Sequence, residues 1–423
     1  MSLLDWARSN GASIAEGVVI KDTPHGRGLV ATKPVSGEVV SIPESLLVTA
    51  DFVQKYSNSV TDPLGTWLKQ LANDDNTPPR RSLCGFLFYQ KHLINTGKPD
   101  PKWSEWVKSL PTHEDMNLPF TWEDGELKQI EHTSIFQATL AKKRFVSAFY
   151  ETRLEPLIHS KAAFHDWVLC EEWVASRALS LKDGRIAMVP VVDMCNHDSF
   201  PNSMYTQEGI EGCNLVTHGN VNEDTELTIT YGHSGAGEFL FNYGFIPHAK
   251  DAGELSLLFD PMEDDIVQHF VPESDSIGLG HIYQTCTISG FVDVPSRLIL
   301  SSGDKVWDND FILLFTVFPH LEYASRGEDD EEGFLTLKDK VIDLQDLDQS
   351  VKAADEKIYA ASRRVGDYFV SKLISDHIVK PANDSHPLVA LENALYQRVT
   401  ASLTSWANAT AEEAYSSNLT KSN

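Results

Sequence analysis

The chain has 423 residues, enough for two or three domains, and 42% of them are hydrophobic, which is too many for a disordered chain. Its 35 Lys and Arg residues against 61 Asp and Glu residues give a formal net charge of −26, which argues against a surface built to grip nucleic acid. The sequence has no apolar run of roughly 18 residues and no C-x-x-C pair among its five cysteines, which argues against a membrane helix, a zinc cluster and a disulfide framework. We expect a soluble protein of the cytoplasm or the nucleus, with no membrane or nucleic-acid partner.

The first fifty residues predict a short helix followed by a small β unit. Ser2 and Asp5 have the spacing of a capping box, and Gly11 can end a helix over residues 2–10. From 16 to 49, short β-rich runs alternate with turn residues such as Pro24-His25-Gly26, which leaves little room for a helix.

A helical block follows, and then the β texture returns. Residues 51–182 contain long stretches with few breaks, such as Arg81 to Leu93 and Thr133 to Ile158. Residues 184–246 again hold β-rich runs. Because a helical segment of this length is not a loop, we expect one β domain interrupted by a helical insertion.

The part of the chain after residue 250 is expected to be helical, with a solvated acidic loop at 328–332. Apolar residues there recur at the a and d positions of four heptads. We expect this seam to pack within its own chain, in a monomer, rather than to join two chains. The seam consists of Leu344, Leu347, Val351, Ala354, Ile358, Ala361, Val365 and Tyr368.

Three polar or glycine-containing clusters in the β-rich blocks can carry chemistry. His25-Gly26-Arg27-Gly28-Leu29 lets the backbone approach a ligand, although most such turns are structural. It lacks the pattern of a dinucleotide site. The second cluster, 193–202, is rich in Asp, Asn and His, and its alternative interpretation is a simple polar turn. The third holds two Tyr-Gly pairs, at Tyr231 and Tyr243, which can instead be core tyrosines with satisfied hydroxyls.

Taken together, the clusters resemble the SET-domain methyltransferase family. The chain has G-R-G-L-V-A near its start, then N-H-x-x-x-P-N at 196–202, E-L-T-I-T-Y-G at 226–232 and N-Y-G-F at 242–245. The wider layout is similar to the Rubisco large-subunit methyltransferase-like branch. That branch includes enzymes acting on ribosomal proteins, elongation factors and, in one subgroup, an actin histidine.

The resemblance implies an α+β fold with a pseudoknotted, β-rich SET unit. Residues 1–50 and 183–248 would form its two parts, and the helical insertion would span 51–182. An all-helical domain over 249–423 would bind the substrate. The resemblance also implies S-adenosylmethionine as the cofactor and no metal.

The family's cofactor contacts carry over to several positions of this sequence. The backbone of Arg27, Gly28 and Leu29 would contact S-adenosylmethionine, and Asn196 and His197 would hold its methionine and adenine parts.

Further contacts and the reaction itself carry over to five more residues. Asp193 and Ser176 would lie near the cofactor, and Phe245 would wall its pocket. Tyr231 would be the catalytic tyrosine and would also touch the cofactor. Tyr243 would act with it by lining the channel that admits the target side chain.

The leading hypothesis is therefore a protein-lysine methyltransferase whose substrate is a non-histone protein, such as a ribosomal protein or an elongation factor. The charge of −26 suits a basic protein substrate. One alternative is a histidine methyltransferase, but Tyr243-Gly244-Phe245 is the lysine-type form of the last motif. The other is a SET-type binding protein without activity, but Tyr231 and the Asn196-His197 pair are both present.

Overall fold

The computed structural model describes two compact units. The first consists of Met1–Asp124, Gln137–His233 and Phe239–Phe245, and the second of Gly125–Phe136, Ser234–Glu238 and Ile246–Asn423. The described residues are 1–131, 133–158, 160–207, 212–232, 235–247, 254–258, 297–301, 321–324, 334–343, 346–357, 359 and 386–393.

The first unit begins with the predicted helix, α1 (Leu3–Ser9). The Ser2 hydroxyl oxygen accepts a hydrogen bond from the Asp5 backbone N–H, which caps the helix. Gly11 follows the helix with a φ of +98°, a conformation that glycine adopts without strain.

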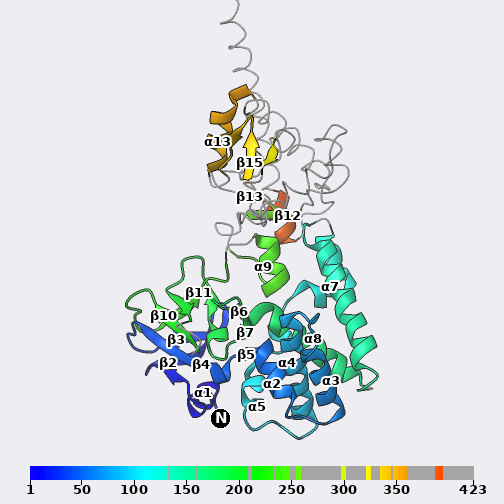
Figure 1. The fold of residues 1–423 in the computed structure, drawn as a ribbon. Coiled ribbons are helices and arrows are strands. Elements are labelled where there is room, and N and C mark those ends of the chain that lie inside the picture. The colour runs from blue at the N-terminus through cyan, green and yellow to red at the C-terminus, as the bar shows by residue number, and fades with distance from the viewer. Residues whose placement is uncertain are drawn as a thin grey trace, which may run out of the picture. The chain divides into compact units, whose positions relative to one another are not determined.

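Two four-stranded sheets join the two β-rich blocks of the sequence (Figure 1). Strands of the first block pair with strands near residues 196–229, so residues far apart in the chain share one framework. One sheet has the order β1 (Ser13–Ile14), β4 (Glu38–Pro43), β10 (Gly212–Thr217) and β9 (Ser203–Thr206). The other has the order β2 (Val18–Thr23), β3 (Gly26–Ala31), β11 (Thr225–Ile229) and β8 (Asn196–His197). A third, small sheet has the order β5 (Val48–Thr49), β7 (Ile186–Met188) and β6 (Ala178–Ser180).

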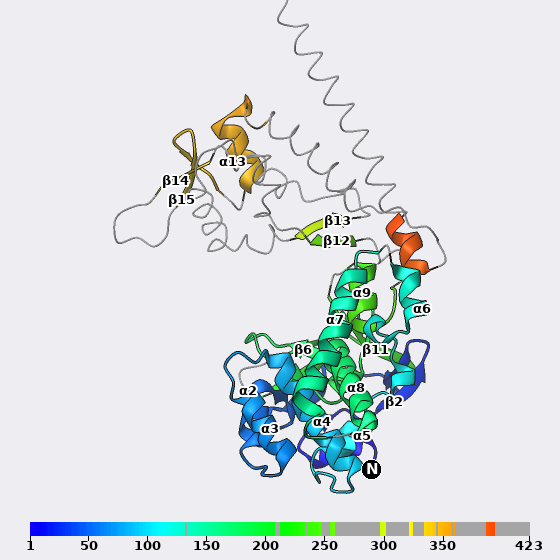
Figure 2. The ribbon, with the colours of Figure 1, turned by 90° about the vertical axis from the view of Figure 1, so that its right-hand side faces the viewer.

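The helical block packs α2, α3 and α8 against α4, as Figure 2 shows. Buried aromatic side chains fill its interior, including Trp103, Trp106, Trp167 and Trp173, and they account for much of its apolar contact area. The helices are α2 (Ala50–Ser57), α3 (Pro63–Ala72), α4 (Pro79–Asn95), α5 (Ser104–Ser109), α6 (Asp124–Leu127), α7 (Phe136–Phe149) and α8 (Lys161–Arg177). A π-helical turn, Tyr150–Leu154, continues α7, and α9 (Ala236–Tyr243) follows the last motif strand.

The part of the chain after residue 250 is not all helical, so that prediction was wrong. Its described residues include five strands, which form a two-stranded and a three-stranded antiparallel sheet. They are β12 (Glu254–Leu258), β13 (Arg297–Ser301), β14 (Glu322–Ala324), β15 (Phe334–Leu337) and β16 (Lys340–Val341).

Among the described residues, the predicted heptad seam includes the helix α13 (Leu347–Ala354), and helical structure resumes at Glu356 after a break at Asp355. The helix ends there because Asp355 is extended, with φ −155° and ψ 106°. Val351 is fully buried, as a seam residue should be. The seam residues Leu344, Ile358, Ala361, Val365 and Tyr368 lie outside the described residues.

None of the helices in the described part of the chain is both long enough and apolar enough to cross a membrane.

Candidate active site

The Asn-His motif lies on β8, a two-residue strand held parallel to β11. Asn196 is in register with Thr228, and His197 with Ile229. The last residue of the motif, Asn202, folds back onto the same strand. Its side-chain amide donates to the Glu226 carbonyl at 2.7 Å, and its side-chain oxygen accepts from the Thr228 N–H at 3.0 Å. These two hydrogen bonds of Asn202 hold the motif against β11.

Gly28 of β3 is packed tightly against two motif side chains. A Cβ at this position would lie 2.3 Å from Glu226 Oε1 and 2.9 Å from Asn196 Nδ2. These two side chains are themselves joined, because Asn196 Nδ2 donates to Glu226 Oε1 at 2.7 Å. A larger residue here would displace the Glu226 and Asn196 side chains, and the first and second sequence clusters meet at this point.

The two residues that flank Gly28 differ in their exposure to solvent. Arg27 is exposed, and its guanidinium donates to the Ser109 carbonyl at 2.9 Å. Leu29 is fully buried in the core, between its strand partners Ile20 and Leu227.

Tyr231 is held at both its backbone and its hydroxyl. Its N–H donates to His197 Nδ1 at 3.1 Å, and its hydroxyl donates to the Cys195 carbonyl at 2.7 Å. The first bond requires His197 Nδ1 to be unprotonated. Burial raises the pKa of Tyr231 well above its ordinary value, so the phenol stays neutral near pH 7.

An aromatic cluster surrounds this pair. The ring centroids of Tyr231 and Tyr243 are 4.6 Å apart, and those of His197 and Phe239 are 4.7 Å apart. Phe245 lies 6.1 Å from His197 and 6.4 Å from Tyr231. Helix α9 supplies Phe239 and Tyr243. This short helix therefore brings the motif at 242–245 next to His197 and Tyr231.

Asp193 is a buried carboxylate at a strained turn. The side chain is 5% exposed, and neither of its oxygens has a hydrogen-bond partner among the described residues. Burial raises the pKa of Asp193 to about 6, and the positive charge of Arg177 opposes that shift. Two residues earlier, the β-branched Val191 has a φ of +74°, which costs on the order of 1–3 kcal/mol and is typical of functional sites.

A cavity of about 590 Å³ opens beside Tyr231. Four of the predicted site residues line it, namely Ser176, Asp193, Tyr231 and Tyr243. The predicted residues Arg27, Gly28, Leu29, Asn196, His197 and Phe245 do not. Cys195 lines the cavity, and the next residue, Asn196, turns its side chain to Gly28 instead, as alternation along a strand requires. Asn196 thus lies on the opposite side of β8 from Cys195, whereas the same alternation returns His197 to the Cys195 side, where its ring contacts Tyr231.

The sequence analysis missed several residues of this cavity. Arg177 follows Ser176 at the end of α8, and its guanidinium donates to the Asp193 carbonyl at 2.6 Å. Cys195 acts through its backbone carbonyl. No sequence motif marks Arg177 or Cys195, although Arg177 is next to the predicted residue Ser176 and Cys195 is next to Asn196.

Comparisons with known proteins fit this geometry. Residues 26–232 match the sequence model of the SET domain. The chain is 26% identical over 264 residues to SET domain-containing protein 8 of Schizosaccharomyces pombe, covering 59% of this chain and 57% of that protein. It is 24% identical over 262 residues to the human actin-histidine N-methyltransferase, and the match covers 57% of this chain and 41% of that protein. The match thus spans about half the length of these curated relatives.

Solved structures show the same fold over almost the whole chain. The structure of Rubisco LSMT bound to AdoMet has a TM-score of 0.63, with 14% identity, and the alignment covers 97% of this chain and 92% of that one. The SET domain of LSMT bound to lysine and AdoHcy gives the same values.

Proposed function

The chain belongs to the SET-domain family, and we propose that it is a protein methyltransferase that uses S-adenosylmethionine and acts on lysine. The observation that carries this proposal is Tyr231. Its neutral hydroxyl is fixed at the wall of a cavity, while its backbone is fixed by His197. The SET-domain match over 26–232 includes both residues.

The cofactor is assigned to the region around β8, between the end of β3 and the aromatic cluster. The described residues fit such a group, because Asn196 and His197 are only partly buried and the His197 ring lies among the rings of Phe239 and Phe245. Gly28 itself is covered by the Glu226 and Asn196 side chains. Arg27 and Leu29 would contribute backbone groups, and Phe245 an aromatic wall. Asp193 and Ser176 lie on the cavity side, next to Tyr231. The solved LSMT structures hold AdoMet or AdoHcy.

When bound, S-adenosylmethionine supplies an activated methyl group for an in-line displacement, so no metal is needed. The lysine amine must be neutral to attack, yet at its reference pKa of about 10.4 roughly one molecule in 2,500 is neutral at pH 7. The walls formed by Tyr231 and Tyr243 remove water from the amine, which lowers its pKa. The buried Asp193 carboxylate attracts the ammonium into the cavity before its proton leaves.

Tyr231 is assigned to orientation rather than to proton removal. Its hydroxyl hydrogen is used by the Cys195 carbonyl, which leaves the phenol oxygen free to accept a hydrogen bond from the amine. A phenol whose pKa is raised is not a phenolate at pH 7, so water takes the proton. The tyrosine thus contributes mainly by holding the amine in line.

Histidine is the second candidate target, and the sequence match to actin-histidine enzymes favours it. The Tyr243-Gly244-Phe245 form of the last motif favours lysine. In this proposal, residues 249–423 hold the protein substrate, and the charge of −26 favours a basic one.

The test is a methyl-transfer assay. The purified chain is incubated with S-adenosylmethionine labelled in its methyl group and a basic cell extract, and the labelled proteins are hydrolysed to amino acids. We expect label in methyllysine. Label in methylhistidine would establish the second candidate, whereas cofactor binding with no label in any protein would identify a binding protein without activity.

A further inference from the structure

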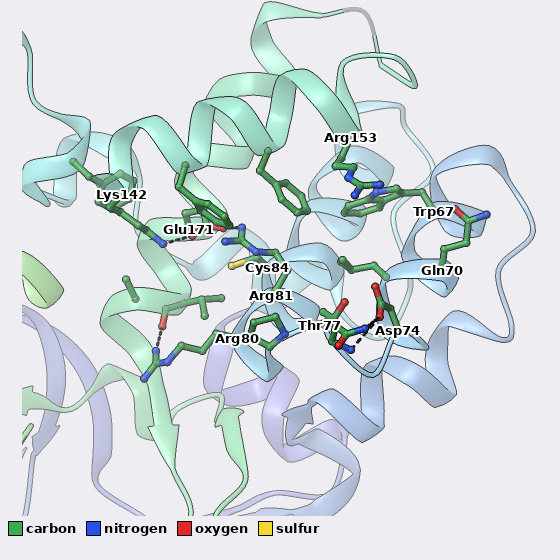
Figure 3. Close-up of a pocket in the computed structure, with 18 of the residues that line it drawn as sticks. Trp67, Gln70, Asp74, Thr77, Arg80, Arg81, Cys84, Lys142, Arg153 and Glu171 are labelled. Carbon is green, nitrogen blue, oxygen red and sulfur yellow. Dashed lines mark hydrogen bonds and ion pairs between the residues drawn. The ribbon is translucent and has the colours of Figure 1, made fainter. Parts of the chain in front are cut away.

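A second cavity, of about 520 Å³, lies within the helical block of the first unit. Side chains from α3, α4, α7 and α8 line it, among them Trp67, Arg81, Phe145 and Glu171 (Figure 3). Its size is within the range of small-molecule sites. Tyr231 does not line it, whereas Asn242 of the last motif does, and Arg80 lines both this cavity and the 590 Å³ cavity.

The charge of this cavity opposes that of the whole chain. Four cationic side chains line it, namely Arg80, Arg81, Lys142 and Arg153, against the two carboxylates of Asp74 and Glu171. The protein carries a net charge of −26, so a local excess of positive charge is not a consequence of composition. Such an excess attracts an anion.

Two of the four cations share a single carboxylate, so the three groups together keep one positive charge. Glu171 is buried, with 3% of its side chain exposed, and it pairs with both Arg81 and Lys142. Figure 3 shows these two pairs converging on the Glu171 carboxylate. The Arg81 guanidinium also lies over the rings of Phe145 and Phe149, at 4.7 and 4.6 Å. Arg81, Lys142 and Glu171 therefore form a fixed wall.

The other two cations retain their charge for a ligand. Arg80 and Arg153 have no ion-pair partner among the described residues. Arg80 uses one N–H on the Val174 carbonyl at 2.9 Å, and Arg153 is exposed on the π-helical turn that follows α7. A guanidinium presents paired donors that match the oxygens of a carboxylate or a phosphate.

Aromatic rings provide the rest of the lining. Phe145 is 52% exposed, which is unusual for a phenylalanine in a helix, and Trp67 lies on α3. From this combination we propose that the cavity is a second ligand site, which binds a small organic anion with a flat, apolar body. The proposal goes beyond the methyltransferase function and does not depend on it.

Binding is tested on the full chain with four small probes. Benzoate and phenyl phosphate carry an anion on a ring, inorganic phosphate carries the anion alone, and benzylamine carries the ring with a positive charge. We expect benzoate or phenyl phosphate to bind with a Kd of about 1 mM or below, at least tenfold more tightly than inorganic phosphate or benzylamine, by calorimetry. Equal binding of benzylamine, or no binding of either aromatic anion, would overturn the proposal.

Trp67 locates the bound probe. We expect the aromatic anion to change the tryptophan fluorescence of the parent protein, and we expect the Trp67→Phe variant to lose most of that change. A full fluorescence change in Trp67→Phe would place the probe elsewhere and reject this cavity.

Matched arginine variants test the charge. Arg153→Gln removes one of the two available cations, and Arg144→Gln removes an exposed cation of α7 that does not line the cavity. We expect the first variant to weaken binding about tenfold and the second to leave it within twofold. Thermal melts check that both variants are folded. Equal affinities in the two folded variants would contradict the assigned anion site.

Discussion

Tyr231 combines two functions in one residue, because its backbone orients a histidine and its side chain lines the proposed catalytic cavity. The N–H bond to His197 and the hydroxyl bond to Cys195 leave the phenol little rotational freedom. A preorganised hydroxyl of this kind costs nothing to align when the substrate arrives.

Replacing Tyr231 with Phe should therefore separate the chemistry from the fold. The ring contacts with Tyr243 and Phe245 remain, whereas the acceptor for the amine is lost. We expect kcat to fall by a factor on the order of 10² or more, with cofactor binding intact. Tyr205→Phe is the matched control, because it removes a phenol hydroxyl from the same cavity that instead donates to the Ser180 carbonyl. Near-normal turnover by Tyr231→Phe would remove this residue from its role.

His197 tests the location of the cofactor. We expect His197→Ala to weaken S-adenosylmethionine binding by roughly tenfold or more in calorimetry, and to lose some stability because the Tyr231 N–H then lacks its acceptor. His218→Ala is the control, since His218 lines the 590 Å³ cavity and His197 does not. If both variants bind the cofactor as the parent does, the assignment of the cofactor to the His197 side is wrong.

For single residues, the sequence predicted which side chains the motifs contribute, but it did not predict the backbone conformation that positions them. In the structure Asn196 packs against Gly28, and Tyr231 is hydrogen-bonded to His197, while the functional roles of these residues stay predictions. The positive φ of Val191 could not be predicted, because a β-branched residue disfavours that region and only the surrounding fold imposes it.

Among the elements, the strands after residue 250 show where local patterns are insufficient. The segment Glu254–Leu258 is five residues long, and such a short apolar run is compatible with either a helix or a strand. Its pairing with Arg297–Ser301 decides the outcome, and that partner lies about forty residues away. In α13, the heptad pattern continues past Ala354, but Asp355 pairs with Lys338 and adopts an extended backbone. The periodicity thus did not predict the break at Asp355, after which helical structure resumes at Glu356.

One contact in the second unit predicts a pH-dependent stability. The Glu392 carboxylate is 5% exposed and accepts hydrogen bonds from the Ser134 N–H at 3.0 Å and the Ser134 hydroxyl at 2.7 Å. Burial raises its pKa from 4.5 to about 7, against the opposing effect of these bonds. Between these pH values the folded state keeps a proton that the unfolded state releases, so the stability falls as the pH rises.

The variant Glu392→Gln does not titrate and should escape this loss. We expect it to be more stable than the parent at pH 8, by on the order of 1–3 kcal/mol, and to differ little at pH 5. Denaturant unfolding at both pH values measures the difference. The exposed Glu131→Gln in the same unit is the control. A Glu392→Gln variant whose stability relative to the parent is the same at pH 5 and pH 8 would refute the buried, proton-binding carboxyl.

For the whole molecule, the relevant quantity is the net charge of −26, which acts at longer range than any single contact. A charge of this size raises the local concentration of a basic partner and its association rate at low salt. The effect is screened over about 10 Å at 0.1 M ionic strength and over about 3 Å at 1 M. The proposed methyl-transfer step, inside a cavity lined by Tyr231 and Tyr243, would be shielded from that screening.

The salt dependence of the reaction should therefore appear in substrate capture and not in turnover. With a basic protein substrate, we expect kcat/KM to fall at least tenfold between 0.05 and 0.5 M NaCl, with kcat changing less than twofold. A short peptide with the same target residue and no net charge is the control, since it gains little from the field of the protein. If the protein and peptide substrates lose kcat/KM equally, the acidic surface does not contribute to recognition. A salt-independent kcat/KM on the protein substrate would mean that apolar contacts, rather than charge, select the partner.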